Sequence, residues 1–219
     1  LLICEDLWNL QNLYLLQEQV LDAVIAINAS PYTSKKHQHR KLVAKNFVEN
    51  LQRPLIYVNQ VGGQDSLVFD GSSFVLEKSG QTVLQMKDFV EDSALVEVVK
   101  NQQDITVKTL SQNQALEFNE IQRNYQACVL GLYDYVSKNG FKNVLLGMSG
   151  GIDSALVAAI AVDALGAKNV MLYALPSRYN SARSMDDAKA CAKNLAVNLE
   201  IISIESALDA MLFSLNLKR

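Results

Sequence analysis

The chain has 219 residues, of which 49% are apolar and 20% are charged, and its formal net charge is −3. A chain of this length can bury one or two sizeable cores, and its acidic balance argues against a nucleic-acid partner, because such proteins usually present basic surfaces. No apolar stretch is long enough to span a bilayer and no basic-then-apolar leader opens the chain, so we expect a cytoplasmic protein without a membrane partner.

The first half of the chain predicts strands and helices in alternation. Residues 1–3 form an apolar strand, and the leucines that follow recur near helical spacing as far as Glu18, so a strand–turn–helix unit opens the chain with Cys4 at its turn. A second such unit and several short strands follow. The expected ranges are a strand at 23–29, a helix at 39–51 and strands at 55–61, 67–69, 73–76, 82–85 and 94–99. We expect the strand at 94–99 to be the last of this half.

A polar stretch over residues 101–113 separates this half from a helix-rich one. We place the domain boundary inside it, which gives domains 1–109 and 110–219. Beyond the boundary, helices and strands alternate. The expected ranges are a helix at 114–138, a strand at 143–148, a helix at 155–165, a strand at 169–174, a helix from Ser184 and a strand at 199–203. This alternation predicts a parallel sheet.

The three cysteines lie far apart and include no CxxC pair. This spacing indicates reduced thiols and excludes a structural zinc cluster. Cys128 and Cys191 fall among Ala and Leu in helical patterns, so we expect both to be buried.

A glycine-rich loop lies between the strand at 143–148 and the helix at 155–165. Two adjacent glycines let the backbone turn its N–H groups inward, and the following helix adds the positive end of its dipole. The loop therefore predicts a site for nucleotide phosphates. Its expected ATP-binding residues are Gly147, Met148, Ser149, Gly150, Gly151, Ile152, Asp153 and Ser154. The alternative is a Ser/Gly turn that only caps a helix.

Two common phosphate motifs are excluded, because the loop has neither the lysine of GxxxxGK[ST] nor the glycine spacing of GxGxxG. An acidic side chain in an anion-binding loop would repel a bare triphosphate, so we expect Asp153 to hold Mg²⁺. Arg178 and Tyr179 follow the strand at 169–174, at the edge where ligands bind in open α/β sheets. These two residues either contact the nucleotide or belong to an ordinary surface loop, and the sequence leaves both interpretations open.

The string SGGIDS at 149–154 resembles the loop of the ATP pyrophosphatase superfamily, whose members split ATP between the α and β phosphates. Residues 125–172 and 175–195 are similar to glutamine-dependent NAD⁺ synthetases. The resemblance implies that ATP and Mg²⁺ are used in this half, and that its fold is a partial adenine nucleotide α-hydrolase-like, Rossmann-like parallel sheet.

The first half resembles the nitrilase-type glutaminase domain that is fused to such synthetases. The resemblance rests on ICEDLW at 3–8, NASPY at 28–32 and residues 56–74. It implies an α/β fold with a partial nitrilase-like αββα domain first, and it makes Cys4 the nucleophile of a Glu–Lys–Cys triad. A thiol at a strand–helix turn lies near backbone N–H groups that can supply an oxyanion pocket, which agrees with this role. The alternative is a small buried hydrophobe.

By the same resemblance, Ser30 and Lys36 match glutamine-binding positions, and a cation suits the α-carboxylate of that substrate. The alternative for Lys36 is a solvated basic segment that it would share with its neighbours. The triad's Glu and Lys would lie upstream of Cys4, so we expect this chain alone not to hydrolyse glutamine. It starts without Met and stops just after a helix, and we therefore expect a fragment of a longer protein.

The parent enzyme implied by the resemblance is a carbon–nitrogen ligase. It activates deamido-NAD⁺ as an adenylate and lets ammonia from glutamine displace AMP, and we expect a homo-oligomer. One alternative is another SGGxDS amidotransferase, for example one that makes GMP or asparagine, but its glutaminase would not be nitrilase-like. The other is a non-catalytic fragment that serves in binding or oligomerisation.

Overall fold

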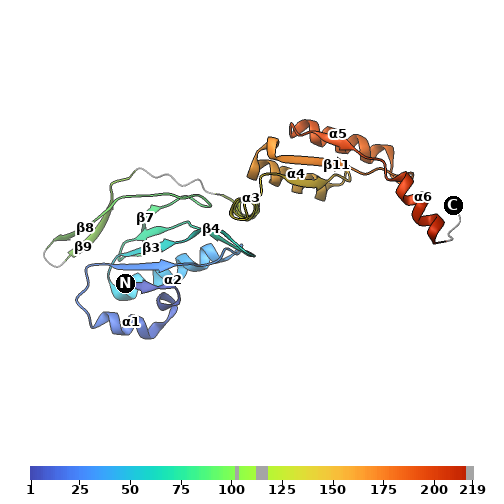
Figure 1. Cartoon of the computed structure of the whole chain (residues 1–219). Coiled ribbons are helices and arrows are strands. Elements are labelled where there is room, and N and C mark those ends of the chain that lie inside the picture. Colours follow the sequence, from blue (N-terminus) through green and yellow to red (C-terminus); the bar gives the residue numbers. More distant parts are fainter. Residues whose placement is uncertain (102–103, 112–117, 216–219) are drawn as a thin grey trace. The chain divides into compact units, whose positions relative to one another are not determined.

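The computed structural model describes residues 1–101, 104–111 and 118–215 (Figure 1). It divides into two compact units, Leu1–Gly131 and Leu132–Arg219. The division falls inside the helix α3 (Glu120–Lys138), not in the polar stretch. The domain boundary at residue 109 stays a prediction. Residues 114–117, the expected start of this helix, lie outside the described residues.

A five-stranded sheet in the order β1-β2-β3-β6-β7 forms the centre of the first unit. β1, β2 and β3 run parallel, and β6 and β7 continue the sheet in antiparallel pairs. The strands are β1 (Leu2–Ile3), β2 (Val24–Asn28), β3 (Leu55–Asn59), β6 (Phe74–Leu76) and β7 (Thr82–Gln85). The parallel strands place the ends of β1, β2 and β3 together at one edge, where polar residues gather.

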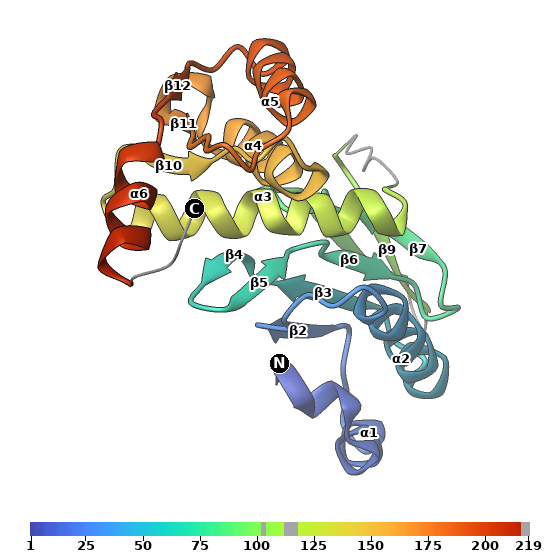
Figure 2. The same ribbon diagram turned by 90° about the vertical axis from the view of Figure 1, so that its right-hand side faces the viewer.

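Two helices cover one face of this sheet, α1 (Leu10–Gln17) and α2 (Lys36–Leu51), and Figure 2 shows α2 running beside the strands. Their apolar side chains share one buried core with residues of β2, β3 and β6. Phe47 and Val48 of α2, for example, are buried against Ala26 and Tyr57. This burial stabilises the fold by about 25 cal/mol for each Å² of apolar surface removed from water.

Two hairpins complete the first unit. They are β4 (Val61–Gln64) with β5 (Leu67–Asp70), and β8 (Val96–Asn101) with β9 (Asp104–Thr109). The expectation that the strand at 94–99 ends this half is wrong, because β9 follows it. Ile105 and Val107 are both buried, and Val107 packs against Val75 and Leu84. Their alternation with polar neighbours was a strand signal inside a segment that reads as polar overall.

The second unit contains a parallel sheet in the order β10-β11-β12, as the alternation predicts. Its strands are β10 (Val144–Gly147), β11 (Val170–Ala174) and β12 (Leu199–Ile201), and its helices are α4 (Ile152–Leu165), α5 (Ala182–Asn194) and α6 (Glu205–Ser214). Each unit also contains a short 3₁₀ helix, η1 (Cys4–Trp8) in the first and η2 (Ala167–Asn169) in the second. Alanines of α4 and α5 share one core with Leu172 of β11. The predicted α/β class is confirmed for both units.

Two local expectations are wrong. The helix α5 begins at Ala182 rather than at Ser184, because the Ser181 side chain accepts a hydrogen bond from the Ser184 N–H and caps it. Cys128 is exposed on α3, whereas Cys191 packs against the core of the second unit. Across the described ranges, we find no helix that is both long and apolar enough to cross a bilayer.

Candidate functional site

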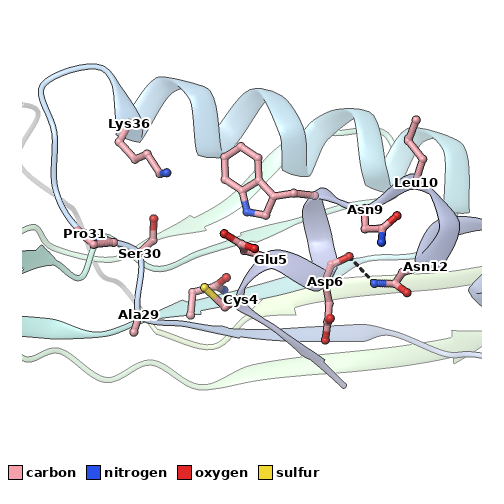
Figure 3. Close-up of a pocket in the computed structure, with 12 residues that line it drawn as sticks. Cys4, Glu5, Asp6, Asn9, Leu10, Asn12, Ala29, Ser30, Pro31 and Lys36 are labelled. Atoms are coloured by element: carbon pink, nitrogen blue, oxygen red, sulfur yellow. Dashed lines mark hydrogen bonds between the residues drawn. The ribbon is translucent and has the colours of Figure 1, made fainter.

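Cys4 is the first residue of η1, directly after β1, so it lies at the predicted strand–helix turn. Its φ is +50°, a left-handed conformation that costs a residue other than glycine about 1–3 kcal/mol. The surrounding contacts hold this turn in place. The Ile3 N–H donates to Asp6 Oδ2 at 2.9 Å, and Asn12 Nδ2 donates to the Asp6 carbonyl at 3.0 Å (Figure 3). The turn presents a half-buried thiol at the edge of the sheet.

A cavity of about 890 Å³ lies at this edge, where β1 and β2 end, and its size suits a small-molecule ligand. Cys4, Ser30 and Lys36 all line it, although they are up to 32 positions apart in the sequence (Figure 3). The structure therefore brings together all three residues that were expected in the glutaminase half. Their roles stay predictions. Sequence reasoning missed further lining residues, which are Glu5, Asp6, Trp8, Asn9, Leu10, Asn12, Asn28, Ala29 and Pro31.

Lys36 begins α2, and its ammonium lies 5.2 Å from the centre of the Trp8 ring. A cation over an aromatic face is attracted by the ring's quadrupole. The Trp8 ring in turn packs edge-to-face against the His39 ring, and the centres of the two rings lie 5.0 Å apart. These contacts hold the charge of Lys36 at the cavity wall, where it can meet an anionic group of a ligand.

The alternative of a fully solvated basic segment is wrong for two of its members. Arg40 is 1% exposed and pairs with the buried Asp70. His37 lies 3.1 Å from the Ser72 hydroxyl, and burial, aided by the charges of Arg123, Lys41 and Arg40, lowers the pKa of its imidazole to about 3. His37 is therefore neutral at physiological pH.

No side chain of the described residues forms a hydrogen bond with the Cys4 thiol. A nucleophilic thiol needs a base that takes its proton. Glu5 lines the same cavity, but it is the next residue along a 3₁₀ turn, and adjacent side chains of a helix do not face each other. The expectation that this chain alone does not hydrolyse glutamine stays a prediction.

The glycine-rich loop of the second unit connects β10 to α4, as predicted. Gly151 is the N-cap of α4, and no side chain of the described residues caps this helix, so its first N–H groups can meet an anion. The alternative of a Ser/Gly turn that only caps the helix stays open, because Gly151 itself occupies the capping position. The two serines shape the loop. Their hydroxyl oxygens lie 3.1 Å apart, Ser149 Oγ accepts from the Gly151 N–H at 3.2 Å, and Ser154 Oγ donates to the Gly151 carbonyl at 2.9 Å.

A second cavity, of about 290 Å³, lies beside this loop at the carboxyl edge of the parallel sheet. Gly147, Met148 and Ser149 line it, and Gly147 stands opposite Tyr173 in the β10–β11 register. The cavity is not lined by the other expected ATP-binding residues of the loop, among them Gly150, Ile152 and Asp153. The remaining lining residues, which sequence reasoning missed, are Tyr173, Ala174, Leu175, Pro176, Asn180, Ser184 and Met185. The signal for them was the end of β11, the neighbouring parallel strand.

Arg178 lies in the same loop after β11, and its side chain is engaged by α6. Its Nε donates to Glu205 Oε2 at 2.8 Å, and its guanidinium also contacts Asp209. Tyr179 is 75% exposed. This geometry favours an ordinary surface loop for both residues.

The expected magnesium ligand, Asp153, is exposed in the first turn of α4. The described residues contain no group of three His, Cys, Asp or Glu side chains that could hold a metal by themselves. Mg²⁺ is commonly bound through one or two carboxylates together with substrate phosphates. A single exposed carboxylate such as Asp153 is compatible with this mode of binding, and its metal role stays a prediction.

Gly150 has a φ of +81°, and a Cβ at this position would lie only 2.0 Å from the Ser184 carbonyl oxygen. We expect Gly150→Ala in the full-length protein to lower ATP affinity at least tenfold, because either the loop or the start of α5 must move, and the positive φ alone costs about 1–3 kcal/mol. Calorimetric titration with ATP and a thermal unfolding scan would measure both effects.

The control for this substitution is Gly151→Ala. The φ of Gly151 is −85°, and a Cβ there would meet only the Ser149 hydroxyl at 3.3 Å. We expect a much smaller loss of ATP affinity. Equal affinities in the two variants would show that the contact with Ser184 does not shape the site.

Residues 124–218 match the NAD synthase family model. The chain is 42% identical to the glutamine-dependent NAD(+) synthetase of Synechocystis over 92% of its own length, and 41% identical to that of Rhodobacter capsulatus over 93%. It spans 38% and 36% of these relatives. A solved structure from Acinetobacter baumannii, a glutamine-dependent NAD⁺ synthetase in complex with adenosine diphosphate, matches 97% of this chain and 40% of its own, with a TM-score of 0.90 and 40% identity. These findings confirm the predicted resemblance in both halves.

Proposed function

The chain is homologous along nearly its whole length to part of the glutamine-dependent NAD⁺ synthetases, and on that premise we propose that it takes part in converting deamido-NAD⁺ to NAD⁺ with ATP and glutamine. The observation that carries the proposal is that one chain contains two sites, each of which fits one of the two half-reactions. One is a cavity lined by Cys4, Ser30 and Lys36, and the other is an uncapped phosphate loop at 147–154. The relatives are longer than this chain, so the activity belongs to the full-length protein.

The first site would release ammonia from glutamine. Cys4 Sγ attacks the side-chain amide carbon, a thioester forms, and the C–N bond breaks as the nitrogen takes a proton and leaves as ammonia. Water then hydrolyses the thioester to glutamate and restores the thiol. Ser30 and the Lys36 ammonium bind the substrate, with the cation at its α-carboxylate. A carboxylate base and a lysine from sequence outside this chain would complete the triad.

The second site would activate deamido-NAD⁺. The nicotinic acid carboxylate attacks the α-phosphorus of ATP, pyrophosphate leaves, and ammonia then displaces AMP from the acyl carbon. The N–H groups at the start of α4 and the hydroxyls of Ser149 and Ser154 would bind the phosphates. Asp153 would hold Mg²⁺, which neutralises phosphate charge when it is bound.

The chain offers several exposed apolar side chains on α4 and α6, among them Ile152, Met211 and Phe213. These side chains would be buried if a second copy of the protein covered the two helices. We expect the full-length protein to be a homo-oligomer, which sedimentation would measure.

The experiment that tests this function is a product analysis. We expect the full-length protein to form AMP and pyrophosphate only when deamido-NAD⁺ and an ammonia source are both present. Formation of ADP would contradict the proposal, because a phosphate loop of this class releases pyrophosphate. An assay with nicotinic acid in place of deamido-NAD⁺ serves as the substrate control.

A further inference from the structure

A series of buried polar contacts connects α2 to the loop after β2 in the first unit. Arg40 of α2 forms an ion pair with Asp70 at the end of β5. Asn59, at the end of β3, donates through Nδ2 to Asp70 Oδ1 at 3.3 Å and to the Gly71 carbonyl at 3.0 Å. Its Oδ1 accepts a hydrogen bond from the Ser30 N–H at 3.0 Å.

The burial of these groups is not explained by stability. The side chains of Arg40 and Asp70 are 1% and 0% exposed, and the desolvation of such a pair often offsets its attraction, so that apolar replacements of similar volume are neutral or stabilising. Within the part of the chain that the structure describes, Arg40 Nε and Nη1 are also buried without hydrogen-bond partners. A costly and incompletely satisfied pair of this kind suggests a role other than holding the fold together.

This series of contacts ends at Ser30 on one side and at Arg40, in the same helix as Lys36, on the other. At one end, Asn59 fixes the backbone of Ser30. At the other, Arg40 lies four residues after Lys36, so the two share one face of α2. The pair with Asp70 therefore fixes the first turn of α2, and with it Lys36, against the same frame that fixes Ser30.

We propose that Arg40, Asp70 and Asn59 are positioning residues that set the spacing between Ser30 and Lys36 and so determine how tightly the cysteine cavity binds an amino-acid substrate. The proposal rests on the function proposed above, because it takes glutamine as the ligand of that cavity. None of the three touches the reacting atoms, so the expected effect falls on substrate affinity and leaves the chemical step intact.

The test is the double variant Arg40→Met/Asp70→Asn in the full-length protein, which removes both charges and replaces each side chain by one of similar size. We expect the KM for glutamine to rise at least tenfold, while ammonia-driven turnover and the thermal midpoint stay at the wild-type values. The control is Lys45→Met/Glu49→Leu, which removes an exposed ion pair from the same helix and should change none of these quantities. Unchanged KM, or equal loss of glutamine-driven and ammonia-driven turnover, would overturn the proposal.

A second variant, Asn59→Ala, cuts the contact with Ser30 and leaves the ion pair in place. It should also raise the KM for glutamine, and it decides the matter if the double variant does not fold. Failure of both variants to fold would assign the network to the fold alone and overturn the proposal.

A readout without turnover separates this proposal from the proposed function. Peptide mass spectrometry, which separates Cys4 from the exposed Cys128, would follow the alkylation of Cys4 by a diazoketone analogue of glutamine and by iodoacetamide, which has no amino-acid group. We expect the ratio of the two rates to fall at least tenfold in both variants. Absence of glutamine-driven turnover in the unmodified protein would refute the proposed function, whereas an unchanged ratio would refute the positioning role.

Discussion

Cys4→Ala in the full-length protein is expected to abolish glutamine-driven NAD⁺ formation, by a factor of at least about 1,000, because it removes the only atom in the cavity that can form the thioester. Ammonia-driven formation should stay at the wild-type rate, since Cys4 lies in the first unit and the phosphate loop in the second. Steady-state assays with glutamine and with ammonium chloride, under otherwise equal conditions, would measure both rates.

The matched control is Cys128→Ala. Cys128 is an exposed thiol on α3 and lines neither of the two cavities described here. Both rates should remain at wild-type values in this variant. If Cys4→Ala lowered the two rates equally, the division of labour between the units would be incorrect and Cys4 would serve the fold.

Local patterns account for what the sequence could predict. The turn that carries Cys4 and the loop around Gly150 are each specified within about ten residues, by an apolar strand, a break and a helical repeat. The parallel sheet of the second unit likewise follows from the order of its elements. In each case the signal and the structure that it specifies lie close together along the chain.

Long-range contacts account for what the sequence could not predict. Arg40 reads as one charge in a solvated segment, and only its pairing with Asp70, thirty residues later, makes it a buried residue. Trp8 ends η1, and it meets Lys36 at the cavity wall because α2 packs beside η1. Such residues are identified by which elements pack together, and pattern alone does not give that information.

Asp153→Asn is expected to reduce ATP turnover by at least about 100-fold at a fixed low magnesium concentration, which corresponds to about 2.7 kcal/mol of transition-state stabilisation. The amide keeps the size and the first-turn position of the side chain but removes the charge that attracts the cation. If Asp153 holds Mg²⁺, the magnesium concentration for half-maximal rate should also rise, and a titration of the AMP-forming rate with magnesium chloride would measure this shift.

The control for this charge change is Asp163→Asn, on the same helix α4 and about 15 Å further along its axis at 1.5 Å per residue. This carboxylate is also exposed, but it lies far from the loop, so both the rate and the magnesium dependence should stay at wild-type values. A rate loss in Asp153→Asn without any shift in magnesium dependence would contradict the metal role and leave Asp153 as a residue that only shapes the start of α4. The magnesium dependence therefore distinguishes a ligand of the cation from a structural carboxylate.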